Sequence, residues 1–388
     1  MNYIVISPNY PQNFQEFSVS LAKKGFTVLG IGNESYDELG DKVKSSLTDY
    51  YKVSDLHHLD EVKRGVAFFF YKYGVIDRIE SQNEYWMALD AELRTQFHVP
   101  GLKMDDLFKT RKKSEMKKLF EKAGVPVVPG YLIKEQADIS KGVSDLGLPL
   151  IAKPDTGVGA AATYKLETDR DVTEFENQFK SEVPYFLEPF VTGDIVTYDG
   201  LLDRHGNIVF ESGIEYSATP LQLLTKEKDI AYFVTKDIEP ELRKLGQKII
   251  KEFEMTERFF HVEFFRRADG SYITIEYNNR PPGSYAVDMY NYAYSRSLFD
   301  DYADIVNGDA FAQKKDNGKE CLMITRRFEI DYQVSEAELY QEYGENIVAR
   351  LENPHAFRDL QGDVTYIILA DSKEHREEIA RKFADRSS

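Results

Sequence analysis

The chain has 388 residues, with 49 Lys and Arg against 66 Asp and Glu, and its formal net charge at pH 7 is −17. This charge argues against a nucleic-acid partner, because a protein neutralises phosphates with a basic surface. A hydrophobic content of 42% and an aromatic content of 13% exclude a globally disordered chain. The single cysteine, Cys321, excludes an intrachain disulfide framework and a cysteine-based metal site.

No segment of the sequence has the pattern of a targeting or membrane-spanning segment. The N-terminus runs directly into an apolar strand pattern, without a basic leader or a cleavage site. The longest dense apolar run, residues 66–71, is far shorter than a membrane span. We therefore expect a cytoplasmic protein with no membrane partner.

The first hundred residues alternate between strand and helix patterns. The predicted elements are strands at 3–6, 26–31 and 75–79 and helices at 14–24, 59–73 and 86–97. Such alternation is typical of a doubly wound parallel sheet, here an α/β domain over residues 1–108. No G-x-G-x-x-G follows the first strand, so we do not predict a dinucleotide site there.

Later segments predict further strands and helices. Strands are predicted at 127–133, 148–153, 185–190, 195–202, 208–214, 321–328 and 364–369, and helices at 110–123, 239–253, 297–307 and 373–383. Residues 259–284 are the most informative stretch, because two alternating apolar–polar runs flank Asp269-Gly270, the strongest short hairpin signal. A two-residue turn would place Glu263 opposite Glu276 and His261 opposite Asn278, with Ile273, Ile275 and Tyr277 on the apolar face.

Two facing carboxylates with Cβ atoms about 5 Å apart repel each other. Solvent, uneven protonation or a cation must relieve this repulsion. Two carboxylates and the Asn278 amide are oxygen ligands that Mg²⁺ accepts, with phosphate completing its coordination. Arg280 follows them on a turn stiffened by two prolines, where its guanidinium can hold a phosphate oxygen or a carboxylate. The alternative is a solvated hairpin face with two incidental glutamates.

A second candidate site lies in the first half of the chain. The apolar strand at 148–153 ends in Lys153, and the loop PDTGVGAAAT with Gly157 and Gly159 follows it. Small side chains let backbone N–H groups approach an anion, although this loop is not a Walker A sequence. The alternatives are a plain turn and a lysine that extends to solvent.

These motifs, in this order, resemble one family. KSEM…GVPV, PLIAKPDTGVGAA, FLEPFVTGD and HVEF…DG…TIEYNNRPPG resemble the ATP-grasp superfamily of carboxylate–amine ligases, especially its carbamoyl-phosphate-synthase-like members. The resemblance covers about residues 1–310. It implies a parallel-sheet domain at 1–108, two α+β subdomains at 109–190 and 191–318 that clasp ATP, and an α+β extension at 319–388.

The resemblance also implies roles for individual residues. Lys113 and Lys153 would contact the ATP phosphates, with Lys112 open as the alternative to Lys113, and the loop with Gly157 and Gly159 would cover them. The adenine would lie against the linker at Glu188, Pro189 and Val191, and the ribose against Asp194. Glu263, Glu276 and Asn278 would hold two Mg²⁺ ions, with Mn²⁺ as an alternative metal. Arg280 would stabilise the transferred phosphoryl group, whereas His261 would be structural.

The implied reaction is an ATP-dependent condensation of a small carboxylate with an amine, amino acids included, through an acyl phosphate. Two alternatives stay open. One is an enzyme whose product is carbamoyl phosphate or another acyl phosphate, and the other is a nucleotide-binding regulatory protein without turnover. The substrates are not readable from the sequence. The oligomeric state is open too, with a homodimer as the commonest arrangement.

Overall fold

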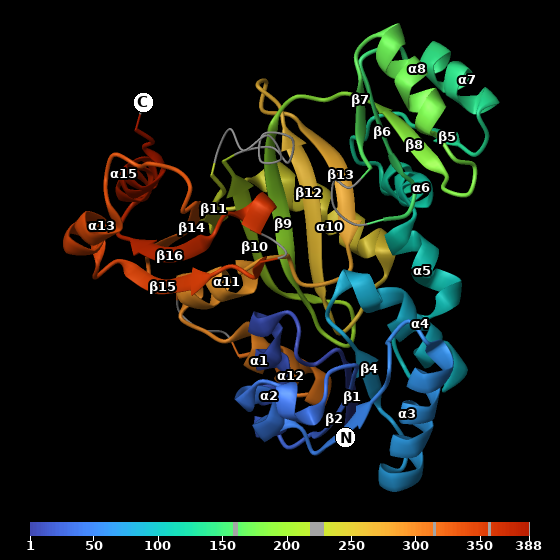
Figure 1. Ribbon diagram of the computed structural model, residues 1–388, viewed down its shortest axis with the longest axis vertical. Helices are drawn as coiled ribbons and strands as arrows, with labels where there is room; N and C mark the ends of the chain where they lie inside the picture. Colours follow the sequence, from blue (N-terminus) through green and yellow to red (C-terminus); the bar gives the residue numbers. More distant parts are fainter. Residues whose placement is uncertain (158–161, 218–228, 313–315, 356–357, 388) are drawn as a thin grey trace.

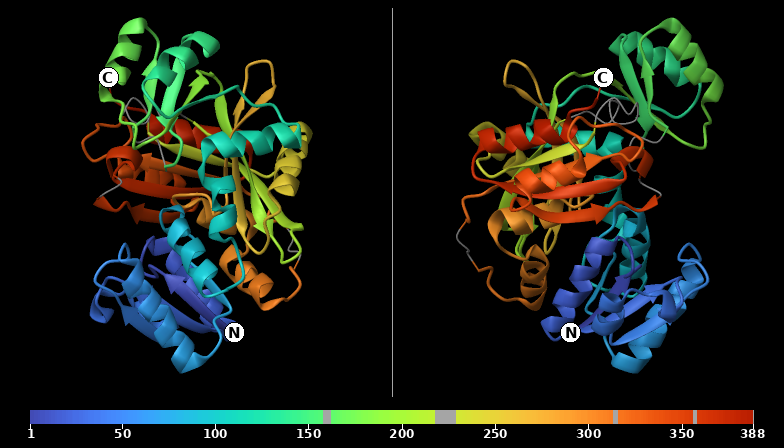
Figure 2. Two further views of the ribbon diagram at one scale, coloured as in Figure 1. Left: turned by 90° about the vertical axis from the view of Figure 1, so that its right-hand side faces the viewer. Right: turned by 60° about the vertical axis from the view of Figure 1, so that its left-hand side comes forward.

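The computed structural model of the chain describes residues 1–157, 162–217, 229–312, 316–355 and 358–387. Within these residues the strands form three sheets, two of four strands and one of eight (Figure 1). The N-terminal sheet and the second four-stranded sheet lie at opposite ends of the eight-stranded sheet (Figure 2). No helix in the described part of the chain is long and apolar enough to cross a membrane.

The N-terminal sheet is parallel throughout, which confirms the prediction from the alternating pattern. Its strand order is β3-β2-β1-β4. The strands are β1 (Asn2–Ile6), β2 (Thr27–Gly32), β3 (Asp49–Lys52) and β4 (Arg78–Glu80), and the helices are α1 (Gln15–Lys23), α2 (Asp41–Ser46), α3 (Leu59–Tyr73) and α4 (Met87–Gln96). Helix α1 packs on the face that carries Tyr3 and Val5, and α3 and α4 pack on the face that carries Ile4 and Ile6. The sheet is therefore covered on both sides.

The second four-stranded sheet is antiparallel, in the order β5-β8-β6-β7. Its elements are β5 (Tyr131–Ile133), α7 (Ala137–Leu146), β6 (Leu150–Pro154), β7 (Tyr164–Leu166), α8 (Asp169–Gln178) and β8 (Tyr185–Pro189). Two helices, α5 (Met104–Arg111) and α6 (Lys113–Ala123), join it to the N-terminal sheet. The sequence predicted one helix over 110–123, but the chain is extended at Lys112 and α6 starts only after it.

The eight-stranded sheet has the order β13-β12-β9-β10-β11-β14-β16-β15. Its strands are β9 (Asp194–Leu202), β10 (Ile208–Tyr216), β11 (Ala231–Thr235), β12 (Phe259–Arg266), β13 (Tyr272–Asn278), β14 (Glu320–Arg326), β15 (Ile347–Glu352) and β16 (Val364–Ala370). Its helices are α10 (Pro240–Phe253), α11 (Ala286–Tyr294), α12 (Leu298–Asn307), α13 (Glu336–Tyr343), α14 (Arg358–Gln361) and α15 (Lys373–Ala384). The C-terminal strands continue this sheet through the pairing of β11 with β14, so β14, β15 and β16 belong to the same sheet.

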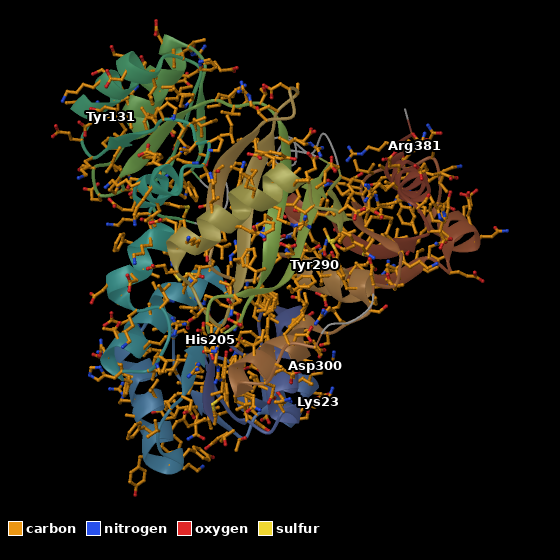
Figure 3. All side chains as sticks on the ribbon, turned by 180° about the vertical axis from the view of Figure 1, so that it is seen from behind. Lys23, Tyr131, His205, Tyr290, Asp300 and Arg381 are labelled. Atoms are coloured by element: carbon orange, nitrogen blue, oxygen red, sulfur yellow. The ribbon has the colours of Figure 1, made fainter. Side chains whose placement is uncertain are left out.

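The N-terminal sheet docks on the larger sheet through α12, which packs against α1. At this contact the hydroxyls of Tyr3 and Tyr302 lie 2.8 Å apart in the core. At the surface Lys23 pairs with Asp300 at 3.2 Å, and both are labelled in Figure 3. The two regions therefore bury a common apolar surface.

The turn between β12 and β13 differs from the predicted two-residue turn. The Arg267 amide donates to the Ser271 carbonyl at 2.8 Å, so three residues connect the strands. Gly270, the last of the three, has φ +79°, the left-handed conformation that such turns require. Asp269-Gly270 therefore predicted the position of the turn correctly, but the predicted length of two residues was wrong.

A β-bulge restores the predicted register farther from the turn. Phe264 lies opposite Thr274, whereas Glu263 lies opposite Glu276, so Ile275 is an extra residue on β13. The bulge also changes which residues are buried. Tyr272 and Thr274 are 3% and 1% exposed, whereas the predicted apolar positions Ile273 and Ile275 are only partly buried.

A tight contact between α10 and β9 gives a stability prediction. A Cβ atom added to Gly246 would lie 2.1 Å from the Tyr198 ring, so Gly246→Ala forces the ring or the helix to move. Overpacking of this kind costs about 1–3 kcal/mol, and we expect a lower midpoint temperature in thermal unfolding. Gly283→Ala is the control, because a Cβ there meets no atom within 4 Å. Equal midpoints for the two variants would contradict the packing argument.

Candidate active site

The facing carboxylates of β12 and β13 form the centre of the site. Glu263 lies opposite Glu276, and Asn278 lies opposite His261, as the sequence predicted. The side chains of Glu263 and Glu276 are 24% and 26% exposed, so they are accessible from one face of the sheet. Asn278 is 4% exposed and its amide nitrogen has no hydrogen-bond partner among the described residues. This donor set fits Mg²⁺, which takes carboxylate and amide oxygens and completes its coordination with water or phosphate.

The two carboxylates differ in pKa, which relieves their repulsion in part. Burial raises the pKa of Glu276, and the charges of Glu263 and Glu84 add to this increase against the opposing charge of Lys113. Burial would also raise the pKa of Glu263, but the hydrogen bond from His261 and the charge of His261 outweigh burial, so the Glu263 pKa is lowered. The two shifts have opposite directions, so Glu263 is the more readily ionised of the two carboxylates.

His261 bridges two carboxylates within the core. The residue is 2% exposed, with Nδ1 2.7 Å from Asp199 Oδ1 and Nε2 3.0 Å from Glu263 Oε1. Burial lowers the His261 pKa, but the charge and hydrogen bond of Asp199 and the bond to Glu263 outweigh this and raise it to about 9. At neutral pH both ring nitrogens therefore donate. The sequence suggested a structural role across the strand pair, but it gave no sign of Asp199.

Lysines from the second four-stranded sheet and from α6 face this centre. Lys153 lies next to the last residue of β6 and pairs with Glu188 of β8. Burial lowers the Lys153 pKa, but the charges of Glu188 and Glu276 more than offset it, so the pKa is raised. Lys117 on α6 lies 2.5 Å from the same Glu188 carboxylate. Sequence reasoning missed Lys117, although it lies four residues after Lys113 and thus on the same face of the helix.

Lys113 connects the two sides of the site. Its Nζ lies 3.5 Å from Glu276 Oε1 and donates to the Gly157 carbonyl at 3.3 Å. The neighbouring Lys112 is exposed, and its backbone pairs with Thr156. Gly159, the other predicted glycine of the loop, lies outside the described residues.

The lysine geometry predicts a ranking of nucleotide affinities. Lys153 sits on a rigid strand, so Lys153→Ala should weaken ATP binding more than Lys113→Ala, because neighbouring Lys112 can substitute in part for Lys113. We expect about a 10-fold or greater loss for Lys153→Ala, the effect of removing one charge-assisted hydrogen bond. Titration calorimetry with ATP measures the affinities of Lys153→Ala, Lys113→Ala and Lys112→Ala. A larger loss for Lys113→Ala would reverse the ranking.

Arg280 is held by a carboxylate from the N-terminal sheet. Its Nε and Nη2 atoms lie 2.8 and 2.7 Å from Glu84 Oε2, and its Nη1 donates to the Pro281 carbonyl at 2.9 Å. Sequence reasoning missed Glu84. The signal was its place just after β4, because the carboxyl ends of parallel strands are where open α/β sheets bind ligands.

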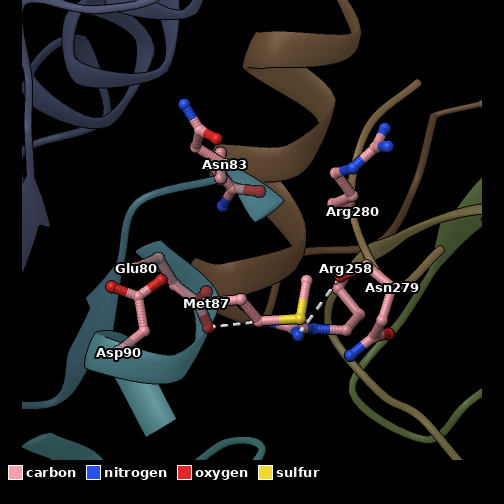
Figure 4. A pocket seen from close by; sticks show the side chains of 8 residues that line it. Glu80, Asn83, Met87, Asp90, Arg258, Asn279 and Arg280 are labelled. Atoms are coloured by element: carbon pink, nitrogen blue, oxygen red, sulfur yellow. Dashed lines mark hydrogen bonds and ion pairs between the residues drawn. The ribbon is translucent and has the colours of Figure 1, made fainter. Parts of the chain in front are cut away.

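A buried polar network fixes the metal-bearing hairpin to the N-terminal sheet (Figure 4). Glu80 of β4 pairs with Arg258 and with Arg94, at 2.7 Å each. Arg258 also donates to the Asn279 carbonyl at 3.4 Å, next to Arg280. A cavity of about 10 Å³ lies within this network, the volume of about one water molecule. The position of Arg280 therefore depends on both parts of the protein.

The predicted adenine and ribose contacts lie at the edge of the site. Pro189 is the last residue of β8, and Val191 follows it in the linker. The Glu188 side chain pairs with Lys117 and Lys153. Asp194 is not brought together with the other predicted residues. It lies on the same side of β9 as Val196, opposite the face that carries Glu263, and pairs with Arg266 at 3.2 Å.

Comparisons with known proteins relate the chain to one family and one fold. Residues 140–288 match the family described as ATP-grasp domain. Among curated proteins, the chain is 24% identical over 268 residues to the L-arginine-specific L-amino acid ligase of Bacillus subtilis. This match covers 66% of the chain and 63% of the length of that relative.

Solved structures show the same fold over nearly the whole chain. An L-amino acid ligase from Bacillus licheniformis superposes with a TM-score of 0.75 at 14% identity, covering 100% of this chain and 98% of that one. The biotin carboxylase domain dimer of the Hydrogenobacter thermophilus 2-oxoglutarate carboxylase, in complex with MgADP, ADP and bicarbonate, gives 0.69 at 14% identity and covers 99% and 90%. The fold expected from the resemblance is therefore confirmed, from the N-terminal parallel sheet to the ATP-grasp sheets.

Proposed function

We propose that this protein is an ATP-dependent ligase that joins a carboxylate to an amine through an acyl phosphate and releases ADP and phosphate. The proposal rests on one observation, which is that carboxylates, lysines and a guanidinium lie close together. Facing carboxylates, Glu263 and Glu276, lie beside the lysines of α6 and β6, and a guanidinium, Arg280, follows on the same hairpin. This set matches the charges of a metal–triphosphate and a reacting carboxylate.

ATP would lie between the second four-stranded sheet and the eight-stranded sheet. Lys153 and Lys113 would bind its phosphates, with Lys113 favoured over Lys112 by its contact with Glu276. Glu263, Glu276 and Asn278 would hold Mg²⁺, which we propose as two ions with Mn²⁺ as a substitute. Held by these residues, Mg²⁺ would supply positive charge to neutralise the phosphate oxygens during transfer. The linker near Val191 would contact the adenine.

In the proposed first step, a substrate carboxylate oxygen attacks the γ-phosphorus, and the bond to the β–γ bridging oxygen breaks to give ADP. In the second, the amine attacks the acyl carbon, phosphate leaves and the amine nitrogen loses a proton. Arg280 can bind two oxygens of the transferring group at once. In the structure the guanidinium contacts the Glu84 carboxylate, so a substrate carboxylate or acyl phosphate would take the place of Glu84 on the same N–H groups.

The substrates are proposed by class. Two of the similar proteins are ligases named for amino acids, so we propose an amino acid as the carboxylate, the amine or both. A stacked pair, Tyr216 and Tyr232 with ring centroids 4.4 Å apart, lies partly exposed near Glu263 and offers an aromatic surface to a substrate side chain. We propose a homodimer, as the neighbour with MgADP is described as a dimer.

Phosphate release tests the proposal. Purified protein with MgATP is screened against pools of amino acids and small carboxylates, and the products are identified by mass spectrometry. Phosphate that appears only with a carboxylate and an amine, together with an amide product, is the expected result. Carboxylate-dependent release that hydroxylamine traps as a hydroxamate, but that no amine converts to an amide, would favour an acyl-phosphate synthase. ATP binding without release from any pool would favour a regulatory protein.

A further inference from the structure

A chain of buried polar side chains runs from the metal-bearing hairpin to helix α11. The Tyr290 hydroxyl, on α11, donates to Asp199 Oδ2. The other oxygen of Asp199 accepts from His261 Nδ1 at 2.7 Å, and His261 Nε2 lies 3.0 Å from Glu263 Oε1. Tyr290, the label in the middle of Figure 3, thus reaches a proposed metal ligand through two intervening side chains.

The members of this chain are confined by burial. Tyr290 is 1% exposed, Asp199 0% and His261 2%. Asp199 also accepts from the Thr197 hydroxyl at 2.7 Å, and Thr197 in turn accepts from the Ile214 amide at 2.9 Å. A buried carboxylate with several donors has one orientation, because losing any of these bonds would leave a polar group unpaired.

This geometry fixes one oxygen of Glu263 and leaves the other for a ligand. A glutamate on a strand has rotamers that differ by several ångströms at the carboxylate, so an unsupported Glu263 would lose conformational entropy on binding a metal. The imidazole contact removes that freedom beforehand. Partners behind a metal ligand typically change metal affinity by about 10–100-fold when removed.

We propose that His261 is a positioning residue that holds Glu263 in its metal-binding orientation, and that Asp199 and Tyr290 extend this support to α11. Because α11 directly follows the turn that carries Arg280, Pro281 and Pro282, the same chain ties the metal ligand to the segment beside the phosphoryl-binding arginine. The inference rests on the proposed function only in taking Glu263 as a metal ligand.

The test measures Mn²⁺ binding in the presence of ADP, from the electron paramagnetic resonance signal of free Mn²⁺, without carboxylate or amine. In His261→Asn the amide can reach Asp199 but not Glu263, and we expect about 10–100-fold weaker Mn²⁺ binding. In His261→Gln the longer side chain can reach Glu263, so the loss should be smaller. Tyr290→Phe should weaken Mn²⁺ binding several-fold, although its ring does not touch the metal ligands.

Tyr302→Phe is the matched control for Tyr290→Phe. It also removes a buried hydroxyl with a hydrogen bond, to Tyr3, but Tyr302 belongs to the contact with the N-terminal sheet. We expect wild-type Mn²⁺ affinity in this variant, at a similar melting temperature to that of Tyr290→Phe. If His261→Asn does not fold, Tyr290→Phe and His261→Gln carry the test.

Wild-type Mn²⁺ affinity in Tyr290→Phe and in both His261 variants overturns the inference. Equal weakening in the Tyr290 and Tyr302 variants also overturns it, because the effect is then one of general packing. These results are independent of ligase activity. A protein that binds Mn²⁺ with ADP as described but makes no amide refutes the proposed function alone. A wild-type protein that does not bind Mn²⁺ with ADP refutes the metal site itself.

Discussion

Replacing Arg280 with lysine is expected to lower turnover by about 100-fold or more, the usual effect of losing one preorganised donor to a developing charge. The guanidinium presents two N–H groups in a plane, as its contact with Glu84 at 2.8 and 2.7 Å illustrates. A lysine ammonium keeps the charge but cannot hold two oxygens of the transferring group at once. MgATP affinity should change little, because the lysine and carboxylate contacts to the nucleotide and metal remain.

The measurement is steady-state phosphate release with a carboxylate and an amine that support it, alongside calorimetric MgATP affinity. Arg266→Lys is the control, because Arg266, on β12, also pairs with carboxylates, Asp194 of β9 and Glu215 of β10, but faces away from the site. A purely structural Arg280 would instead lower the melting temperature and leave the rate per folded molecule unchanged. Turnover near that of wild type in Arg280→Lys would refute the catalytic role.

The parts of the site that sequence alone predicts are those encoded by neighbours in the chain. The pairing of Glu263 with Glu276 depends on one hairpin and its turn signal, and it is confirmed. The prediction nevertheless assumed the wrong turn length. The three-residue turn and the bulge at Ile275 shift the register by one residue each and cancel at the carboxylates. Only the residues between the turn and the bulge, such as Thr274, face the side opposite to the prediction.

The missed residues meet the site through contacts that are distant in sequence. Asp199 reaches His261 across 62 positions, and Glu84 reaches Arg280 across 196. Nothing in the local pattern of Asp199 sets it apart from the other acidic residues of this chain, and only its place just after β4 distinguishes Glu84. Short half-exposed edge strands such as β3 (Asp49–Lys52) were missed for a related reason, because their pairing partners rather than their own composition define them.

Replacing both facing glutamates, as Glu263→Gln/Glu276→Gln, is expected to abolish the metal dependence of nucleotide binding. One unit charge about 4 Å from an ion contributes about 4 kcal/mol at the effective dielectric constant of a protein surface. Desolvation offsets part of this, so we expect MgATP to bind about 100-fold or more weakly. Metal-free ATP should bind at least as well as to the wild type, because two negative charges near the phosphates are gone.

The opposite signs of these two effects separate metal binding from general damage to the site. Calorimetric affinities for ATP with Mg²⁺ and with EDTA give both quantities on the same preparation. Glu211→Gln is the control, since Glu211 bonds Tyr198 on the other face of the sheet. If the double variant and the wild type bind MgATP equally, Glu263 and Glu276 are not the metal ligands, and the lysines alone hold the nucleotide.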